Sequence, residues 1–340
     1  MLGQVEITPF HWAGFIVVVL LFLSLDLGVF HRRAHVVRFQ EAFTWTVVWF
    51  GLALVFAFAF VKPNMGEKKT LLFITGYITE LSLSMDNVFV IALIFAYFRI
   101  PTEHQHRVLF WGILGALIMR GLMILAGVSL IERFEWLLYL FGAFLIYSSL
   151  KMMFAEEEGV HPEKNPVIRL AQKVYPVANT FDGQKFIARV DGRRALTPLA
   201  IVLLMVETTD VIFAVDSIPA IFGLTTDPFI VFTSNVFAIL GLRSLYFVLA
   251  GAIGYFRYLK VGLSIVLAFI GVKMLLDPHL KEHEHGVREA RWFQIEIDPN
   301  VSLAVVASII LTSMIFSLIV ARRGHPAARK AEDDSEPDSP

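Results

Sequence analysis

Nine runs of mainly apolar residues, each long enough to cross a lipid bilayer, constrain this chain more than any other feature of its sequence. A hydrocarbon core of about 30 Å needs roughly 20 apolar residues in a helix. Only 17% of the residues are charged, whereas soluble domains carry about 25%. The sequence therefore predicts an all-α polytopic membrane protein, embedded in a bilayer, with about nine transmembrane helices. The runs cover residues 10–30, 43–61, 71–97, 108–130, 135–153, 197–222, 229–252, 259–276 and 301–321.

The distribution of Lys and Arg residues predicts how the chain is oriented. If the N-terminus is outside, the cytoplasmic segments carry 18 of the 29 Lys and Arg residues, and the outside segments carry 7. Because cytoplasmic loops of membrane proteins are enriched in these residues, we expect the N-terminus outside and the C-terminus in the cytoplasm. No Lys or Arg precedes the first run, so we interpret it as a retained span and not as a cleavable signal peptide.

The spans divide the chain into seven segments. Residues 155–196 form the longest loop, which we place in the cytoplasm. Two Asp-Gly turn signals flank a strand-like run there and predict a small β-hairpin. The polar, acidic tail, 323–340, is expected to be disordered. The other segments are two N-terminal spans in 1–62, two three-span units in 70–154 and 197–277, an outside loop in 278–300 and a last span in 301–322.

Two spans share a pattern of polar residues, TELSLSMDNVFVIAL (79–93) and TDVIFAVDSIPAIFG (209–223). Each reads Thr, an acid, five residues, Asp and then a small polar residue. An Arg in the following span and a Lys near the end of the third recur in both halves. Spans 3–5 and 6–8 are therefore predicted to be two copies of one three-helix unit. Because three is odd, the copies enter the membrane in opposite directions, an inverted repeat that is typical of transporters with a midplane site.

Five acidic residues lie well inside these spans, where an Asp at a helix centre costs about 2.5–3.5 kcal/mol. We expect them to face the protein interior and to be paired, protonated or bound to a ligand. Helical spacing places polar residues in neighbouring rows on both motif helices, so the two antiparallel helices could bring four or five carboxylates together. The acids are Glu80, Asp86, Glu207, Asp210 and Asp216.

Pro219 lies within the second motif, three residues after Asp216. It cannot donate a hydrogen bond to the carbonyl of Val215, so we expect the helix to kink or open beside Asp216 and Ser217. Freed backbone carbonyls there could join a ligand shell, as they do in broken transporter helices.

The two motifs offer carboxylate, amide, hydroxyl and backbone oxygens, which suit Mg²⁺, Ca²⁺ and Mn²⁺. The chain has no cysteine, which excludes thiolate ligands and disulfides, and none of its ten histidines lies in the core of a span. Protons would compete with a metal at such a site, a route to proton-coupled exchange. No P-loop or catalytic triad is visible, so we expect neither an enzyme nor a resident cofactor. The predicted metal site is Glu80, Asp86, Asn87, Glu207, Asp210, Asp216 and Ser217.

A structural role for the acids remains open. Four bases in or near the spans could neutralise them, in a non-transporting membrane scaffold or assembly protein: Arg120, Arg243, Lys151 and Lys273. We expect the two arginines to be structural or gating partners, because cations repel metal ions. The lysines lie near span ends, from which their side chains can reach the interface. Transport of Ca²⁺ or Mg²⁺ also remains open.

Three stretches closely resemble the TerC family, and within it the longer Alx-type members: TELSLSMDNVFVIAL, VETTDVIFAVDSIPAIFGLTTDPFIVFTSNVFAILGLRSLYF and FGAFLIYSSLKM. The resemblance covers nearly the whole chain. Alx-type members are associated with manganese(II) export from the bacterial cytoplasm, so the resemblance implies an inner-membrane exporter of Mn²⁺. It places at the ion pathway Glu80, Asp86 and Asn87 of the first motif and Glu207, Asp210 and Asp216 of the second.

Overall fold

The computed structural model describes residues 7–25, 39–134, 136–154, 165–178, 181–190, 193–250, 259–276, 295 and 297–333. A π-helical turn, η2 (Ala57–Val61), joins α2 to α3, and strands β1 (Ile187–Val190) and β2 (Arg193–Leu196) precede α8. The helices are α1 (Pro9–Leu25), α2 (Phe39–Phe56), α3 (Lys62–Met65), α4 (Glu67–Tyr97), α5 (Thr102–Arg133), α6 (Leu137–Phe154), α7 (Pro166–Val174), α8 (Pro198–Phe222), α9 (Pro228–Ala250), α10 (Leu259–Leu276) and α11 (Pro299–Asp333).

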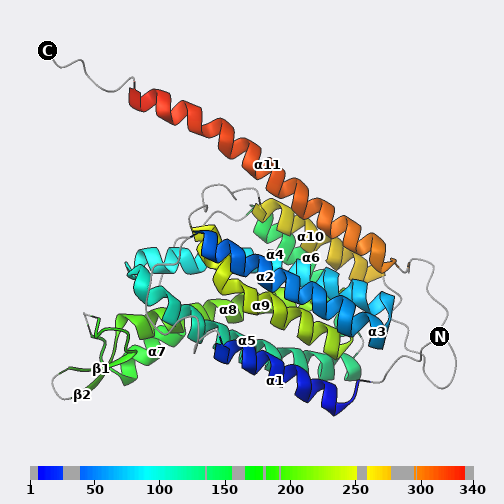
Figure 1. The fold of residues 1–340 in the computed structure, drawn as a ribbon, viewed down its shortest axis with the longest axis horizontal. Coiled ribbons are helices and arrows are strands. Elements are labelled where there is room, and N and C mark those ends of the chain that lie inside the picture. The colour runs from blue at the N-terminus through cyan, green and yellow to red at the C-terminus, as the bar shows by residue number, and fades with distance from the viewer. Residues whose placement is uncertain are drawn as a thin grey trace.

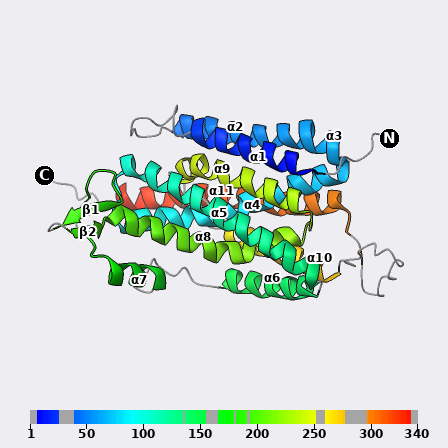
Figure 2. The ribbon, with the colours of Figure 1, turned by 90° about the horizontal axis from the view of Figure 1, so that it is seen from below.

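The described residues contain eight helical segments that are long and apolar enough to cross a membrane, counting α2, η2 and α3 as one. The helix α1 is shorter and also apolar. These segments coincide with the nine predicted spans, so the all-α polytopic membrane class is confirmed. Most of the helices lie side by side along one direction (Figures 1 and 2). Which end of the bundle faces the cytoplasm stays a prediction.

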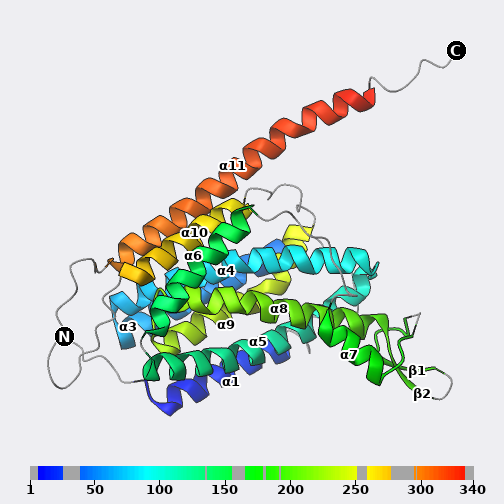
Figure 3. The same cartoon turned by 180° about the vertical axis from the view of Figure 1, so that it is seen from behind.

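The helix α9 lies at the centre of the bundle and is the most enclosed of the spans. It packs against α4, α2 and α5, while α8 packs against α5 and α4. The helices α4 and α8 start at opposite ends of the bundle, near α3 and near the β-hairpin respectively (Figure 3). The pairs α4 with α9, α5 with α8 and α6 with α10 are those that two copies related by a two-fold axis would form. The repeat itself stays a prediction.

Two glycines allow α6 and α10 to approach closely. A Cβ atom added at Gly271 would lie 2.8 Å from the carbonyl oxygen of Gly142, and one added at Gly142 would lie 3.0 Å from the carbonyl oxygen of Gly271. The first distance is shorter than real Cβ atoms show and the second is tighter than most of their contacts, so the two backbones lie very close together. In a bilayer the hydrophobic effect does not drive helices together, because the lipid tails are as apolar as the side chains. Helices associate there through close van der Waals packing, which small residues at the crossing make possible.

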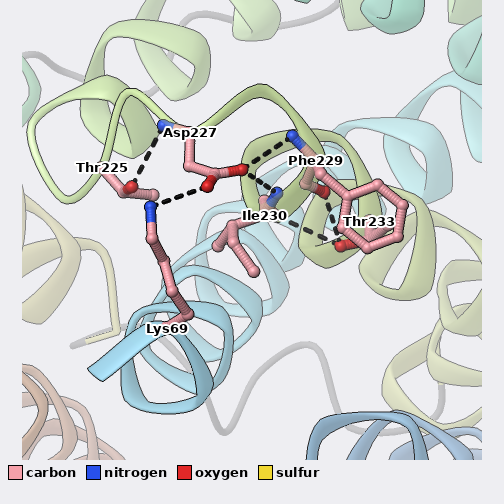
Figure 4. Close-up of polar contacts among 6 residues, drawn as sticks. All are labelled: Lys69, Thr225, Asp227, Phe229, Ile230 and Thr233. Atoms are coloured by element: carbon pink, nitrogen blue, oxygen red, sulfur yellow. Dashed lines mark hydrogen bonds and ion pairs between the residues drawn. The ribbon is translucent and has the colours of Figure 1, made fainter. Parts of the chain in front are cut away.

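A polar contact ties the start of α4 to the start of α9 (Figure 4). One carboxylate oxygen of Asp227 accepts hydrogen bonds from the N–H groups of Phe229 (3.0 Å) and Ile230 (3.2 Å), which caps α9. The other oxygen accepts from Nζ of Lys69 at 2.7 Å. Asp227 also donates its own N–H to Oγ1 of Thr225 at 3.2 Å. One carboxylate therefore sets both where α9 begins and where α4 lies beside it.

The segment before α8 contains the predicted hairpin. Strands β1 and β2 pair antiparallel with Val190 opposite Arg193, which leaves two residues between them. The sequence reasoning missed the helix α7, whose start is signalled by the Asn-Pro pair at 165–166. Asn165 caps this helix by accepting hydrogen bonds from the N–H groups of Val167 and Ile168. Residues 155–164 and most of the predicted outside loop, 278–300, lie outside the described residues.

Two local predictions are wrong. The tail was expected to be disordered from residue 323, but α11 continues to Asp333, and only 334–340 lie outside the described residues. The stretch AARKAED consists of good helix formers and extends a helix that the last span has already nucleated. The predicted opening at Pro219 is also absent from the described helix, because α8 continues through it to Phe222, whereas a kink without a break there stays a prediction. Pro219 lies in the last turn, where a proline removes only one bond of a helix that is about to end.

Candidate ion-pathway site

The helix α4 carries one row of buried polar side chains into the middle of the bundle. Glu80, Ser84 and Asn87 follow the spacing i, i+4, i+7, and their exposed fractions are 1%, 1% and 4%. Thr79 beside them is 2% exposed. Because residues at this spacing share one face of a helix, all point toward neighbouring helices and none toward lipid. The sequence prediction that these polar groups face the interior is therefore met on α4.

Arg120 of α5 connects this row to α8. Its Nη1 atom forms an ion pair with Oε1 of Glu80. Its Nη2 and Nε atoms donate to the two carboxylate oxygens of Asp210, at 3.1 and 3.4 Å. Asn87 donates from Nδ2 to Asp210 at 3.4 Å, and Arg120 Nη1 donates to Oδ1 of Asn235 on α9 at 3.3 Å. Side chains from four helices thus meet in one polar network.

Burial makes this network important for stability. The side chain of Arg120 is 2% exposed and that of Asp210 is 12% exposed. Charges removed from water to this extent are stabilised only by partners of opposite charge and by hydrogen bonds. The guanidinium group uses its fork on Asp210 and a further nitrogen on Glu80, the geometry in which arginine binds carboxylates most strongly. With all three groups ionised, the cluster of two acids and one base carries a net charge of −1.

The other three predicted acids have different surroundings from Glu80 and Asp210. Asp216 is partly buried on α8 and accepts a hydrogen bond from Oγ of Ser148 on α6 at 2.8 Å. Asp86 is partly buried on α4. The carboxylate of Glu207 lies against Gly115 of α5, where an added Cβ atom would overlap it. In the parts of the chain that the structure describes, no group of three or more His, Asp or Glu side chains lies close enough to hold a metal ion. The role of the seven predicted residues as metal ligands stays a prediction.

Several oxygen atoms around the network have no hydrogen-bond partner among the described residues. They are Oγ1 of Thr79, Oε2 of Glu80, Oγ of Ser84 and Oδ1 of Asn87, all on α4. Oγ of Ser217 on α8 also lacks a hydrogen-bond partner among the described residues, and that side chain is 2% exposed. Buried polar atoms in native proteins are almost always paired. A concentration of unpaired oxygens along one helix face indicates a place where water or a cation binds.

Sequence reasoning missed two members of this arrangement. Asn235 lies in FTSNVF, and its signal was a run of three polar residues in the most enclosed span. Ser148 lies in YSSLK, where two adjacent serines precede the repeated Lys. Of the four bases, Arg120 forms ion pairs with Glu80 and Asp210, whereas Arg243 is partly buried, and the structural or gating role expected of both stays a prediction. The two lysines differ: the side chain of Lys151 is exposed, and that of Lys273 is only 3% exposed.

Comparisons with known proteins agree with the architecture. An uncharacterised membrane protein of Myxococcus xanthus, STKORF319, is 51% identical over 93% of this chain and 94% of its own length. Proteins of Salmonella typhi and Escherichia coli K12, both named "Putative membrane-bound redox modulator Alx", are 47% identical over 79% of this chain and 86% of theirs. No solved structure matches the chain significantly.

The family assignment rests on most of the bundle. Residues 65–325 match the description "Integral membrane protein TerC family", a range that contains both acidic motifs and every helix from α4 to α10. The related bacterial proteins match over at least four-fifths of their own length, so the similarity extends beyond the motifs. The chain therefore belongs to the TerC family of integral membrane proteins.

Proposed function

We propose that this chain is a secondary transporter that exports Mn²⁺ from the bacterial cytoplasm, through carboxylate and amide oxygens between α4 and α8. The observation that carries the proposal is the buried network of Glu80, Asn87 and Asp210, with unpaired oxygens beside it. A protein that only needed stable helix packing would gain nothing from unpaired oxygens at this depth. A pathway for a cation needs oxygens that are available when the ion arrives.

The chemistry of the donors supports a hard divalent cation. Carboxylate, amide and hydroxyl oxygens favour Mn²⁺, Mg²⁺ and Ca²⁺ over Zn²⁺ and Cu(I), which prefer sulfur or imidazole. The Alx relatives carry the name of a redox modulator. This chain has no cysteine, so its own thiols take no part in any redox effect, and we propose movement of an ion instead. Among the three ions, Mn²⁺ is chosen for the resemblance of the motifs to Alx-type proteins.

We further propose that the two motif helices belong to an inverted repeat, with the N-terminus outside the inner membrane and the C-terminus in the cytoplasm. In that arrangement Glu207 lies nearer the cytoplasm than Asp216, and Glu80 nearer the outside than Asp86. Acids at several depths would give an ion successive places to bind. Because protons compete for the same oxygens, exchange of Mn²⁺ for protons is the coupling that we propose.

One observation favours a second candidate function. Arg120 neutralises one of the two acids that it contacts, which is also what a structural ion pair would do. On this alternative the chain is a scaffold or assembly protein of the membrane, and the buried acids only hold α4, α5 and α8 together. The two functions differ in whether a cation crosses the membrane.

A flux assay separates them. Purified protein in liposomes is tested with Mn²⁺, Ca²⁺ and Mg²⁺ side by side, as wild type and as Asp86→Asn and Asp216→Asn. Asp227→Asn serves as the matched control, because it removes an acid at the start of α9 that pairs with Lys69 and not with Arg120. We expect Mn²⁺ flux in wild type and control, and loss of flux in the other two. Equal flux in all four proteins would remove Asp86 and Asp216 from the pathway, and no flux of any cation in wild type would favour the scaffold.

A further inference from the structure

Arg120 occupies the position that a cation would take between two acids. Its guanidinium group contacts Glu80 of α4 with one nitrogen and both oxygens of Asp210 of α8 with two others. In the proposed pathway, the same two carboxylates bind the ion between α4 and α8. A divalent cation at this point would be repelled by a fixed positive charge in direct contact with its ligands.

We propose that Arg120 is a tethered counter-ion that holds Glu80 and Asp210 while no metal is bound, and that Mn²⁺ enters by displacing it. The inference rests on the proposed function and names the residue that sets the affinity of that site. Arg120 acts on the metal through the two carboxylates and is a positioning residue, because it never becomes a ligand itself.

The surroundings of Arg120 support displacement over a permanent pair. The carboxylate of Glu80 has a second oxygen, Oε2, that the guanidinium group leaves without a hydrogen-bond partner among the described residues. Oδ1 of Asn87, whose amide nitrogen already touches Asp210, is likewise unpaired in the described parts of the chain. A permanent ion pair in so buried a place is normally completed by further hydrogen bonds. The oxygens left over are of the kind that would enter the shell of a metal.

The structure also provides an acceptor for the displaced group. Nη1 of Arg120 donates to Oδ1 of Asn235 on α9 at 3.3 Å. This neutral amide carbonyl can keep hold of the guanidinium group when both carboxylates turn to a metal. The positive charge then stays beside the site and favours release of the metal in the next step. Occupied and empty states would therefore differ in which cation the two acids hold.

The test compares binding and transport in the full-length protein. Arg120→Gln removes the charge that competes with the metal. Arg133→Gln is the matched control, because Arg133 lies exposed at the end of the same helix, with its guanidinium group over the ring of Phe134. Calorimetric titration of purified protein with Mn²⁺ is expected to give a Kd on the order of tenfold lower in Arg120→Gln, the effect of losing one charge-assisted competitor. In liposomes the same variant should show a lower KM and a lower maximal rate, because the metal binds more tightly and leaves more slowly. A purely structural role does not lower KM.

Arg120→Lys keeps the inference falsifiable if Arg120→Gln fails to fold, and competition by guanidinium in Arg120→Ala adds a second measurement. Arg120→Lys retains the charge but cannot hold both oxygens of Asp210, so it should bind Mn²⁺ more tightly than wild type by a smaller factor. In Arg120→Ala, low-millimolar guanidinium chloride should compete with Mn²⁺, and in wild type it should not.

The outcomes distinguish this inference from the proposed function. If wild type moves Mn²⁺ and the folded Arg120 variants bind it no more tightly than wild type, Arg120 is not the displaced cation, although the transport proposal stands. If wild type neither binds nor moves Mn²⁺, both proposals are overturned.

Discussion

The charge balance of the Glu80, Asp210 and Arg120 cluster leads to a prediction in which similar substitutions have very different effects. Wild type has two acids and one base, with a net charge of −1. Glu80→Gln leaves the fork between Arg120 and Asp210 intact and makes the cluster neutral. Arg120→Gln leaves two buried acids and no base. The double variant Glu80→Gln with Asp210→Asn leaves a buried guanidinium group with no acid.

The magnitudes follow from burial. Removing one partner of a buried ion pair costs about 3–5 kcal/mol, because the other charge is left without compensation. We expect this loss in unfolding free energy for Arg120→Gln and for the double variant. Glu80→Gln loses one charge-assisted contact but also removes the cost of burying a carboxylate. We therefore expect it to stay within about 1.5 kcal/mol of wild type.

The measurement is denaturant-induced unfolding in detergent micelles, with a chelator present so that no metal replaces the missing base. Arg133→Gln, on the same helix but exposed, controls for loss of an arginine as such. The reasoning is refuted if Arg120→Gln unfolds within about 1 kcal/mol of wild type. It is equally refuted if Glu80→Gln costs as much as Arg120→Gln, since the cluster would then not depend on its balance of charge.

Three more predictions concern packing and helix ends. Gly271→Ala should lower the unfolding free energy, measured by chemical unfolding, by about 1–3 kcal/mol, because its Cβ would meet a backbone carbonyl. Gly51→Ala is the control and should not destabilise the protein, because no atom lies within 4 Å of its Cβ position. Equal effects of the two substitutions would contradict the close approach of α6 and α10. Asp227→Ala should lower the unfolding free energy by about 1–2 kcal/mol, measured by thermal unfolding. Asp227→Asn should lower it less, because Asn keeps the helix cap and loses only the ion pair with Lys69. The reverse order would show that the cap is unimportant. Gly115→Ala should push aside the Glu207 carboxylate and reduce Mn²⁺ flux several-fold in liposomes, and unchanged flux would remove Glu207 from the pathway.

Features that depend on one helix at a time could be predicted from the sequence. Span positions follow from bilayer thickness, and the acids of α4 had to turn inward because lipid cannot solvate them. The errors were local as well. Pro219 was expected to kink or open α8, but the helix continues through it to Phe222, in the last turn. The tail was judged by its charge, whereas its helix propensity and its attachment to α11 decided its structure.

The residues that meet in the network could not be predicted in the same way. Periodicity shows which face of a helix is polar, but it does not show the neighbour, the rotation or the depth at which that face packs. Arg120 lies 90 residues from Asp210 and 115 from Asn235 along the chain. No local rule joins residues so far apart. Sequence alone determined that the chain spans a membrane with acids inside it. The packing of α4, α5, α8 and α9 decided the rest: the guanidinium group of Arg120, at 2% exposure, holds two of those acids. Only the tertiary structure could decide this, because side chains on separate helices meet only where the helices cross.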